Sequence, residues 1–212
     1  MLPISAILIV HNEERYIKRC LTSLPDVQEI ILIDQSSTDK TVEIARSLKK
    51  NLKVATRRHI GNADPMRNFA YGLSSQPWIL AIDGDEYLSP KTKEIISKLI
   101  LLPTDIFWFP FKNLINKKNV KKILGEDYHP RLFKKGAIEW HSTLHTYPTL
   151  KSNLEYWLSP SYPFIHDRSW EDIKSSHKAR KNLTDPRTRQ MEFKFLQSVV
   201  NYLGIKDNLE WF

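Results

Sequence analysis

Two hydrophobic patterns alternate along the first hundred residues. Short runs that are apolar throughout, such as residues 4–10, are followed by segments in which apolar residues recur at helical spacing, such as residues 15–24. Runs of the first kind form strands buried on both faces, and such strands occur in parallel sheets covered by helices. The pattern therefore predicts an α/β fold with a mostly parallel central sheet flanked by helices.

The alternation predicts four strands and four helices in this part of the chain. Turn and cap residues support the helices, because Ser89 suits an N-cap position and Pro65 and Pro90 suit first turns. The predicted strands lie at 4–10, 27–34, 51–56 and 77–83, and the predicted helices lie at 15–24, 41–50, 64–75 and 89–102.

The regular alternation stops after residue 102. Residues 105–115 read as a strand broken at Pro110, residues 116–124 as a basic loop or hairpin, and residues 141–168 as an irregular region rich in His, Pro and aromatic residues. Short strands are expected at 129–135 and 136–140, and two helices at 169–183 and 186–204. We expect residues 1–212 to form one domain with a smaller C-terminal part.

Composition and charge narrow the class of protein. No apolar run approaches the roughly 18 to 20 residues of a membrane span, so we expect a soluble chain. The lone Cys20 cannot form an internal disulfide, which fits a reducing compartment and a cytoplasmic protein. Residues 101–212 carry 18 Lys and Arg against 12 Asp and Glu, whereas residues 1–100 carry 14 against 12.

The basic second half has two interpretations. A positive surface attracts a phosphate-rich acceptor, an anionic membrane face or nucleic acid, but it is also a common solvated surface that keeps a protein soluble. The sequence has no zinc-finger spacing and no RNA-binding aromatic motif, so we do not expect a nucleic-acid partner.

Polar side chains gather where the predicted strands end. Ligands of open parallel sheets bind outside the carboxyl ends of the strands, and carboxylates crowded together there repel one another unless a cation joins them. Oxygen ligands of this kind suit Mg²⁺ or Mn²⁺, which commonly bridge a diphosphate. The residues at these ends are His11, Asn12, Glu13, Asp34, Asp83, Asp85 and Glu86.

The order of these motifs resembles a known family. The stretches "ISAILIVHNEERYIKRCLTSL", "EIILIDQSSTDKTVEIA", "GNADPMRNFAYGLSSQPWILAIDGDEYLSP" and "RLFKK" occur as they do in family 2 inverting glycosyltransferases with the GT-A fold, notably small members that build lipopolysaccharide core. The resemblance is strong over residues 4–90. It implies that residues 1–100 bind a nucleotide sugar and that residues 101–212 bind an acceptor.

The resemblance implies a role for each matching residue. Asp83 and Asp85 match the family's Asp-x-Asp motif, with Asp85 as the principal metal ligand and His166 as a further ligand or phosphate contact. The implied cofactor is Mn²⁺ or Mg²⁺. The residues implied to bind the nucleotide sugar are Val10, His11, Asn12, Glu13, Asp34, Ser36, Arg67, Asp83, Gly84 and Asp85.

Several carboxylates are candidates for the catalytic base. An inverting displacement needs a carboxylate near the acceptor hydroxyl, and the candidates are Asp127 and Glu126, with Glu139 as another possibility. Relatives carry a His-Glu pair after the Arg-Leu-Phe motif, whereas here His145 is followed by Thr146. His145 and Arg131 are expected on the acceptor side.

Several alternatives stay open at this point. The leading interpretation is a metal-dependent transferase that moves a sugar from a UDP-sugar, such as UDP-glucose, to a hydroxyl of a glycan or lipid-linked acceptor. The basic second half favours an anionic acceptor at a membrane face. A sugar-nucleotide-binding protein without efficient turnover is the main alternative, because Thr146 stands where a carboxylate is expected. A sugar-phosphate nucleotidyltransferase would need a Gly-rich loop after the first strand, and residues 10–16 have none.

Overall fold

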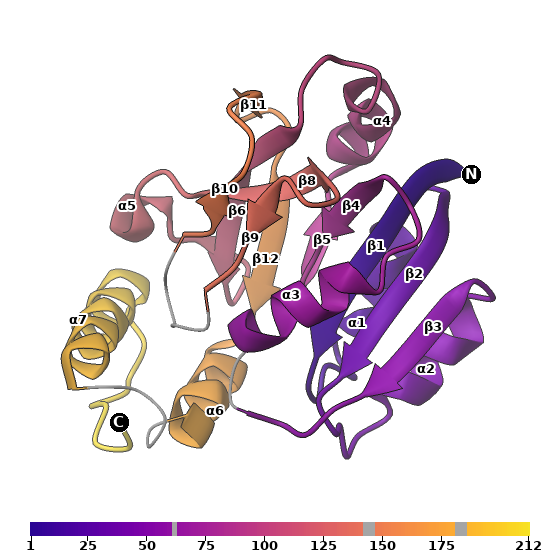
Figure 1. The fold of residues 1–212 in the computed structure, drawn as a ribbon. Helices are drawn as coiled ribbons and strands as arrows, with labels where there is room; N and C mark the ends of the chain where they lie inside the picture. The colour runs from indigo at the N-terminus through magenta and orange to yellow at the C-terminus, as the bar shows by residue number, and fades with distance from the viewer. Residues whose placement is uncertain (61–62, 142–146, 181–185) are drawn as a thin grey trace.

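A computed structural model describes residues 1–60, 63–141, 147–180 and 186–212 of the chain. Its centre is a sheet of ten strands in which the main order is β3-β2-β1-β4-β8-β6-β12-β5. Figure 1 shows this sheet curling through the molecule, with helices on both faces of its N-terminal half.

The N-terminal half of the sheet matches the predicted alternation. Its strands pair in parallel in the order β3-β2-β1-β4, and each helix follows the strand before it. The strands are β1 (Leu2–Val10), β2 (Val27–Asp34), β3 (Leu52–Thr56) and β4 (Trp78–Ala81), and the helices are α1 (Ile17–Ser23), α2 (Thr41–Leu48), α3 (Asp64–Gly72) and α4 (Pro90–Leu99).

Alternate residues of each strand feed two separate cores. Ile4, Ala6 and Leu8 of β1 pack with residues of α1, α2 and α4 on one face of the sheet. Ile7 and Ile9 pack with residues of α3 on the other face. Because a strand presents successive side chains to opposite faces, covering both faces accounts for runs that are apolar throughout.

The C-terminal half of the sheet is more mixed than the sequence predicted. β8 pairs antiparallel with both β4 and β6, β12 pairs parallel with β6, and β5 pairs antiparallel with β12. These strands are β5 (Glu86–Leu88), β6 (Ile106–Ile115), β8 (Tyr128–Lys134) and β12 (Phe164–Arg168). The short elements are β7 (Lys118–Asn119), α5 (Lys121–Leu124), β9 (Ile138–Glu139), β10 (Thr149–Leu150) and β11 (Glu155–Trp157).

The predicted break at Pro110 is wrong. β6 continues through this residue, and Pro110 pairs in register with Tyr128. The backbone N–H of Phe111 donates to the backbone carbonyl of Asp127, on the side of β6 where β8 lies. Because successive backbone nitrogens of a strand point to opposite sides, the nitrogen of Pro110 faces away from β8. On that side β11 pairs with β6 only as far as Trp108, and β12 begins to pair at Phe111. Pro110 lies between the two, where the ladder needs no donor.

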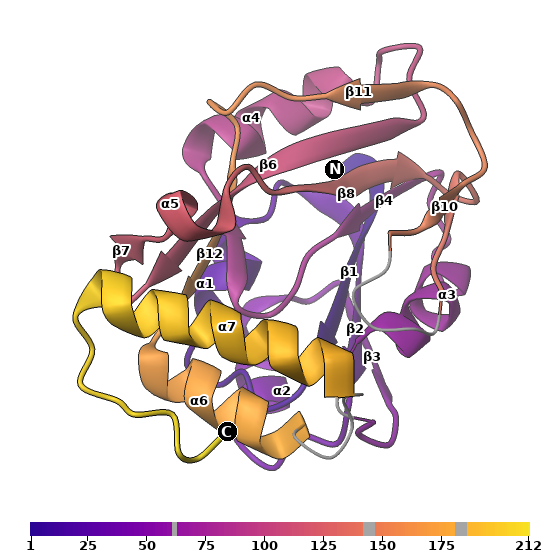
Figure 2. The same cartoon turned by 90° about the vertical axis from the view of Figure 1, so that its left-hand side faces the viewer.

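Two helices close the chain, as the sequence predicted. They are α6 (Trp170–Arg180) and α7 (Pro186–Leu203), and Gly204 follows with a φ of 65°, the left-handed conformation of a helix C-terminus. Figure 2 shows the two helices side by side across one end of the sheet. A third core lies under them and includes Ile115, Val120, Trp170, Leu196 and Val199.

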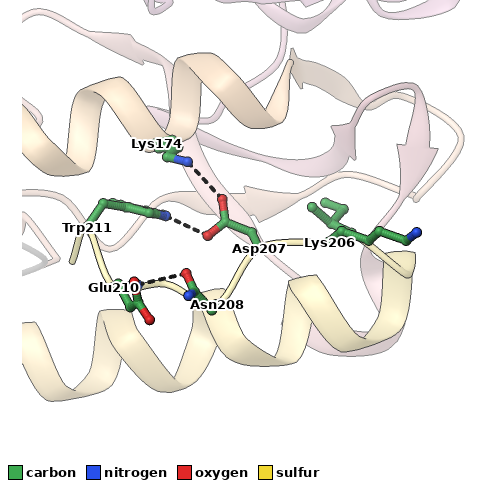
Figure 3. A pocket seen from close by; sticks show the side chains of 7 residues that line it. Lys174, Lys206, Asp207, Asn208, Glu210 and Trp211 are labelled. Carbon is green, nitrogen blue, oxygen red and sulfur yellow. Dashed lines mark hydrogen bonds and ion pairs between the residues drawn. The ribbon is translucent and has the colours of Figure 1, made fainter.

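The tail after α7 folds back on α6. Asp207 accepts hydrogen bonds from Lys174 Nζ at 3.0 Å and from Trp211 Nε1 at 2.7 Å, as Figure 3 shows. A hollow of about 890 Å³ lies here, but Asp207 and its partners are bonded to one another within it. These bonds hold the tail against α6, so we interpret the hollow as part of the packing between the tail and α6 and not as a ligand site.

No helix of the described part of the chain has the length and apolar character of a membrane span.

Candidate functional site

A cleft lies where the first and fourth strands end and where β12 leads into α6. Its volume is about 330 Å³. Both halves of the chain contribute to its walls, as expected for ligands bound at the carboxyl ends of strands. The lining residues are Ile9, Val10, His11, Glu13, Gln35, His59, Ala63, Asp83, Gly84, Asp85, Glu86, His166, Arg168 and Ser176.

Asp83 is held by two arginines. Arg67 Nη2 lies 3.4 Å from Asp83 Oδ2, and Arg131 Nη2 lies 3.1 Å from the same oxygen. Burial favours the neutral acid, but the two guanidinium groups outweigh it and hold the pKa of Asp83 well below its usual range. Asp83 is therefore a carboxylate at neutral pH. Its side chain keeps 27% of its surface exposed, so it can still face a ligand.

Arg131 also joins Asp83 to Glu86. Its guanidinium contacts Glu86 Oε1, and both side chains are buried. Burial, followed by repulsion from Asp83 and Asp85, raises the pKa of Glu86 to about 8 despite the attraction of Arg131. Arg131, which was predicted to lie on the acceptor side, thus forms ion pairs with two carboxylates of the acidic cluster.

Asp85 has a different set of partners. His166 Nε2 lies 3.1 Å from Asp85 Oδ2, and Arg168 Nε lies 3.4 Å from the same oxygen. Burial opposes ionisation, but these two groups lower the pKa of Asp85. The same contact raises the pKa of His166 against the effect of burial. The structure therefore brings together Asp85 and His166, two residues that are 81 positions apart in the chain.

Gly84 lets the acidic loop approach the first strand closely. A Cβ at this position would lie 2.8 Å from Glu13 Cγ and 3.0 Å from Val10 Cγ1. Burial and then the negative charge of Asp85 raise the pKa of Glu13 to about 8. Crowding of acids around the Asp-x-Asp motif is thus a property of the fold, as the sequence predicted.

The remaining predicted nucleotide residues shape the loops beside the cleft. Asp34 Oδ1 accepts a hydrogen bond from Ser37 N at 3.0 Å, and Asn12 Oδ1 accepts one from Thr38 N at 2.8 Å. Asn12 and Ser36 both have positive φ angles, of 56° and 55°. These residues support the cleft but do not line it, whereas His11 does and stacks on His59 with ring centroids 3.7 Å apart.

A divalent cation would have a small protein ligand set here. No cluster of three or more His, Cys, Asp or Glu side chains that could hold a metal occurs within the described ranges. Magnesium-type ions usually take one or two carboxylates and complete their coordination with substrate phosphates and water. The crowded acids at Asp85 and Glu13 fit an ion that binds together with a diphosphate.

The candidate bases lie outside the cleft. Asp127 accepts a hydrogen bond from Asn113 Nδ2 at 2.9 Å and lies 2.9 Å from His129 Nε2, in a pocket of about 180 Å³. Asn113 Oδ1 lies 3.2 Å from His166 Nδ1, so Asp127 is connected to Asp85 through two side chains. Burial is outweighed by the contact with His129, and the pKa of Asp127 is lowered.

The other two candidates for the catalytic base, Glu126 and Glu139, are exposed and form ion pairs at the surface. Glu126 is exposed and pairs with Lys121 at 3.3 Å, and Glu139 is exposed and pairs with Lys151 at 2.7 Å. His145 and Thr146 lie outside the described residues, so their predicted roles stay predictions.

Sequence reasoning missed several residues of the cleft, among them Arg168, Gln35, His59 and Ser176. Arg168 follows His166 by two positions in β12, and residues two apart share one face of a strand. This relation was missed because residues 141–168 were predicted to be irregular. His59 and Ser176 had no signal in the sequence, because only the folded loops and helices bring them to the cleft.

Comparisons with known proteins agree with this arrangement. A model of the family "Glycosyl transferase family 2" matches residues 5–154. The lipopolysaccharide core biosynthesis glycosyltransferase LpsC of Rhizobium meliloti (strain 1021) is 32% identical over 111 residues, which is 50% of this chain and 40% of LpsC. The glycosyltransferase SunS of Bacillus subtilis (strain 168) is 27% identical over 195 residues, which is 86% of this chain and 44% of SunS.

The fold also resembles solved structures. A crystal structure of S. aureus TarS residues 1–349 in complex with UDP superposes with a TM-score of 0.62 at 20% identity, covering 84% of this chain and 64% of that one. The chain spans less than half the length of these two curated relatives. The family match covers well over half of the chain, and the mixed sheet with helices on both faces has the GT-A form. The chain belongs to glycosyl transferase family 2.

Proposed function

We propose that this chain is the donor-binding and catalytic part of a metal-dependent, inverting glycosyltransferase. It transfers a sugar from a UDP-sugar to a hydroxyl of a glycan or lipid-linked acceptor. The observation that carries the proposal is the cleft in which Asp85 faces His166 and Arg168 beside crowded acids. The family match and the UDP complex of TarS support the choice of donor.

In the proposed reaction, the acceptor oxygen forms a bond to the anomeric carbon while the bond from that carbon to the diphosphate oxygen breaks. Asp85 would hold Mn²⁺ or Mg²⁺ together with the donor diphosphate and water, and the bound ion would neutralise charge on the leaving diphosphate. Asp83 and His166, which were predicted as further ligands, would lie beside the ion, because Asp83 is paired with two arginines and no group of three such side chains that could hold a metal occurs among the described residues. Arg168 stands 3.4 Å from Asp85 and faces the same cleft, so its guanidinium is placed to contact phosphate oxygens.

The acceptor proton needs a carboxylate that is ionised at neutral pH. Asp127 meets this condition, because its pKa is lowered by His129 and Asn113. It also connects to the cleft through Asn113 and His166. Glu126 lacks that connection and is exposed. We therefore assign the proton to Asp127 rather than to Glu126.

The basic surface and the acceptor form a second part of the proposal. Lys118, Lys121 and Lys122 are exposed beside β6, so they can bind an anionic acceptor or an anionic membrane face. The chain would then work in the cytoplasm with a peripheral contact to the membrane.

A first experiment separates transfer from binding. Isothermal calorimetry with UDP, with and without Mn²⁺, measures the donor site, and release of UDP from a panel of UDP-sugars measures turnover. We expect Mn²⁺ to tighten UDP binding and UDP release to depend on the metal. Tight UDP binding with no release for any sugar or acceptor would favour the alternative, a sugar-nucleotide-binding protein without efficient turnover.

A second experiment tests the assigned base. Asp127→Asn should lower kcat by about 10²-fold or more with UDP affinity unchanged, because general-base catalysis contributes factors of that size. Glu126→Gln, at the neighbouring position, is the matched control and should keep kcat within about twofold. Equal losses in the two variants would contradict the assignment.

A further inference from the structure

A second pocket adjoins the cleft on the side of the C-terminal helices. It has a volume of about 200 Å³ and lies between the ends of β6 and β12, helix α5 and helices α6 and α7. Three side chains line both spaces, namely His166, Arg168 and Ser176. A molecule whose reacting group lies in the cleft can therefore continue past these residues into the pocket.

The larger part of the exposed lining of this pocket is apolar. The apolar side chains are Leu114, Ile115, Val120, Leu124, Ile173 and Phe195, and the polar ones are Asn113, His166, Arg168, Ser176 and His177. Sugar hydroxyls would lose their hydrogen bonds to water against the apolar part, whereas a hydrocarbon group would be stabilised by leaving water. The apolar part of the lining therefore fits a hydrocarbon group.

The pocket has a closed inner end and an open mouth. Ile115 and Val120 are almost fully buried, whereas Leu124 at the edge is 41% exposed. The helix that carries Leu124 also carries Lys121 and Lys122, which are exposed. An amphiphilic molecule with an anionic group would match both features, because its charge would lie beside the lysines while its chain entered the pocket.

We infer that this pocket binds the hydrocarbon portion of a lipid-linked acceptor whose hydroxyl enters the cleft past His166. The inference rests on the proposed function, since it requires an acceptor hydroxyl in the cleft. Asn113 supports the route, because it lines the pocket and donates to Asp127, the assigned base. Asn113 Oδ1 also lies 3.2 Å from His166 Nδ1, so this one side chain connects the pocket both to Asp127 and to a residue of the cleft.

The first test compares three probes on the full chain. These are octyl, phenyl and methyl β-D-glucopyranoside, used below the concentration at which the octyl compound forms micelles. We expect the octyl compound to bind at least about tenfold more tightly than the methyl compound, because burying two methylene groups changes an affinity by about that factor. With ¹³C-methyl labelling of Ile, Leu and Val, its NMR shifts should concentrate at Ile115, Val120 and Leu124.

Equal affinity of the octyl and methyl compounds would overturn the inference, as would shifts at methyl groups elsewhere. Tighter binding of the phenyl than of the octyl compound would also overturn it, because the pocket would then select an aromatic group and not a hydrocarbon chain.

The second test fills the pocket. Leu124→Trp should reduce the preference for the octyl over the methyl compound to less than about threefold. The control is Leu102→Trp, since Leu102 is 46% exposed and lies after α4, away from the pocket. This control should keep the tenfold preference. A preference that survives in Leu124→Trp, or falls equally in both variants, would contradict the inference.

Failure of this inference differs from failure of the proposed function. If wild-type protein binds UDP but does not prefer the octyl compound, the transferase proposal stands and the acceptor pocket is wrong. If it prefers the octyl compound with the expected NMR shifts but does not bind UDP, the pocket stands and the transferase proposal is wrong.

Discussion

Residues 1–100 and residues 101–212 supply walls of one cleft, but their folds depend on different kinds of contact. In the first part β1, β2, β3 and β4 pair in parallel with one another, within one run of alternating strands and helices. In the second part β8 inserts between β4 and β6, and β5, which precedes α4, pairs with β12 near the other end of the chain. Local patterns therefore describe the first part well, whereas long-range pairing builds the second.

The acidic cluster shows the consequence of this difference. Its carboxylates come from the first part, at the end of β4, whereas the cations that hold them include Arg131, His166 and Arg168 from the second. Variants on the two sides of these contacts can therefore show which part sets the site's stability and which sets its chemistry.

The largest expected effect is on stability, at a contact between the two parts. Arg131→Met should lower the free energy of unfolding by about 3 to 5 kcal/mol, because it removes the buried cation that contacts the buried Glu86 and one of the two arginines that hold Asp83. Urea unfolding followed by tryptophan fluorescence measures it. Arg15→Met is the control, since Arg15 pairs with Asp172 at the surface and should cost no more than about 1 kcal/mol. Similar losses would mean that the buried contact is no more important than a surface pair.

The next effect is on chemistry. Asp85→Ala should reduce transfer by about 10²- to 10³-fold and remove the Mn²⁺ dependence of UDP binding, because stabilisation of the leaving group contributes on this scale. Asp26→Ala, at an exposed carboxylate, is the control. If Asp85→Ala keeps near-normal, metal-dependent transfer, the acidic cluster does not bind the metal and is an ordinary acidic turn.

Asp85→Ala also tests whether Asp85 stabilises or destabilises the folded protein in the absence of metal. Crowding of acids by itself predicts that removing Asp85 relieves repulsion and leaves the protein as stable as before. The structure predicts the opposite, a loss of about 1 to 3 kcal/mol, because Arg168 and His166 lose their shared partner. Thermal unfolding without metal distinguishes the two expectations.

A pH effect is expected within the first part. Burial raises the pKa of Glu29, but hydrogen bonds from Lys53, Ser5 and Ser75 outweigh it and lower the pKa to about 2. The unfolded chain has the ordinary value of 4.5. Because the folded pKa is the lower one, this carboxylate stabilises the protein fully above about pH 4.5, and the contribution falls as the pH falls toward 2.

Glu29→Gln should therefore lower stability at pH 7 by a few kcal/mol, at roughly 1.4 kcal/mol for each unit of pKa difference. It should also flatten the decline of stability between pH 4.5 and pH 2, as measured by urea unfolding at each pH. Glu139→Gln in the second part is the control and should change the pH profile less, since its carboxylate pairs with Lys151 at the surface. An unchanged profile in Glu29→Gln would contradict the assignment.

The smallest effect compares two helix starts. Ser89 Oγ accepts a hydrogen bond from Thr92 N at 3.1 Å at the start of α4, so Ser89→Ala should cost about 1 kcal/mol. Asn119 Oδ1 accepts one from Lys121 N at 2.8 Å before the four-residue α5, and Asn119→Ala should cost less, because a short exposed helix contributes little. A larger loss in Asn119→Ala than in Ser89→Ala would mean that α5 stabilises the second part more than its size implies.

Much of the fold in the first part was predictable. The strands β1 to β4 and the helices α1 to α4 lie where the periodicity placed them. The short strand β5 was not predicted, because its residues Glu86–Leu88 look like the end of an acidic turn until β12 supplies a partner. The continuous β6 was not predicted either, since the tolerance of Pro110 depends on which strands lie beside it.

The site was predictable to the same degree. The polar positions at the strand ends gave His11, Glu13, Asp83, Asp85 and Glu86, and the family resemblance added Val10 and Gly84. All seven residues line the cleft. The positions of Asp34, Asn12 and Ser36 in the supporting loops could not be distinguished from positions in the cleft, because a polar residue after a strand can bond either to a ligand or to the neighbouring turn.

The sequence by itself determined the α/β alternation and the concentration of carboxylates after β4, since both follow from residues that are close together in the chain. Only the tertiary structure decided which cations meet these carboxylates. His166 pairs with Glu86 in the register of β12 and β5, and this register carries its side chain to Asp85 across 81 positions. A contact between residues so far apart in the chain depends on the packing of the whole sheet. It leaves no periodic pattern in the local sequence, so it could be found only in the folded structure.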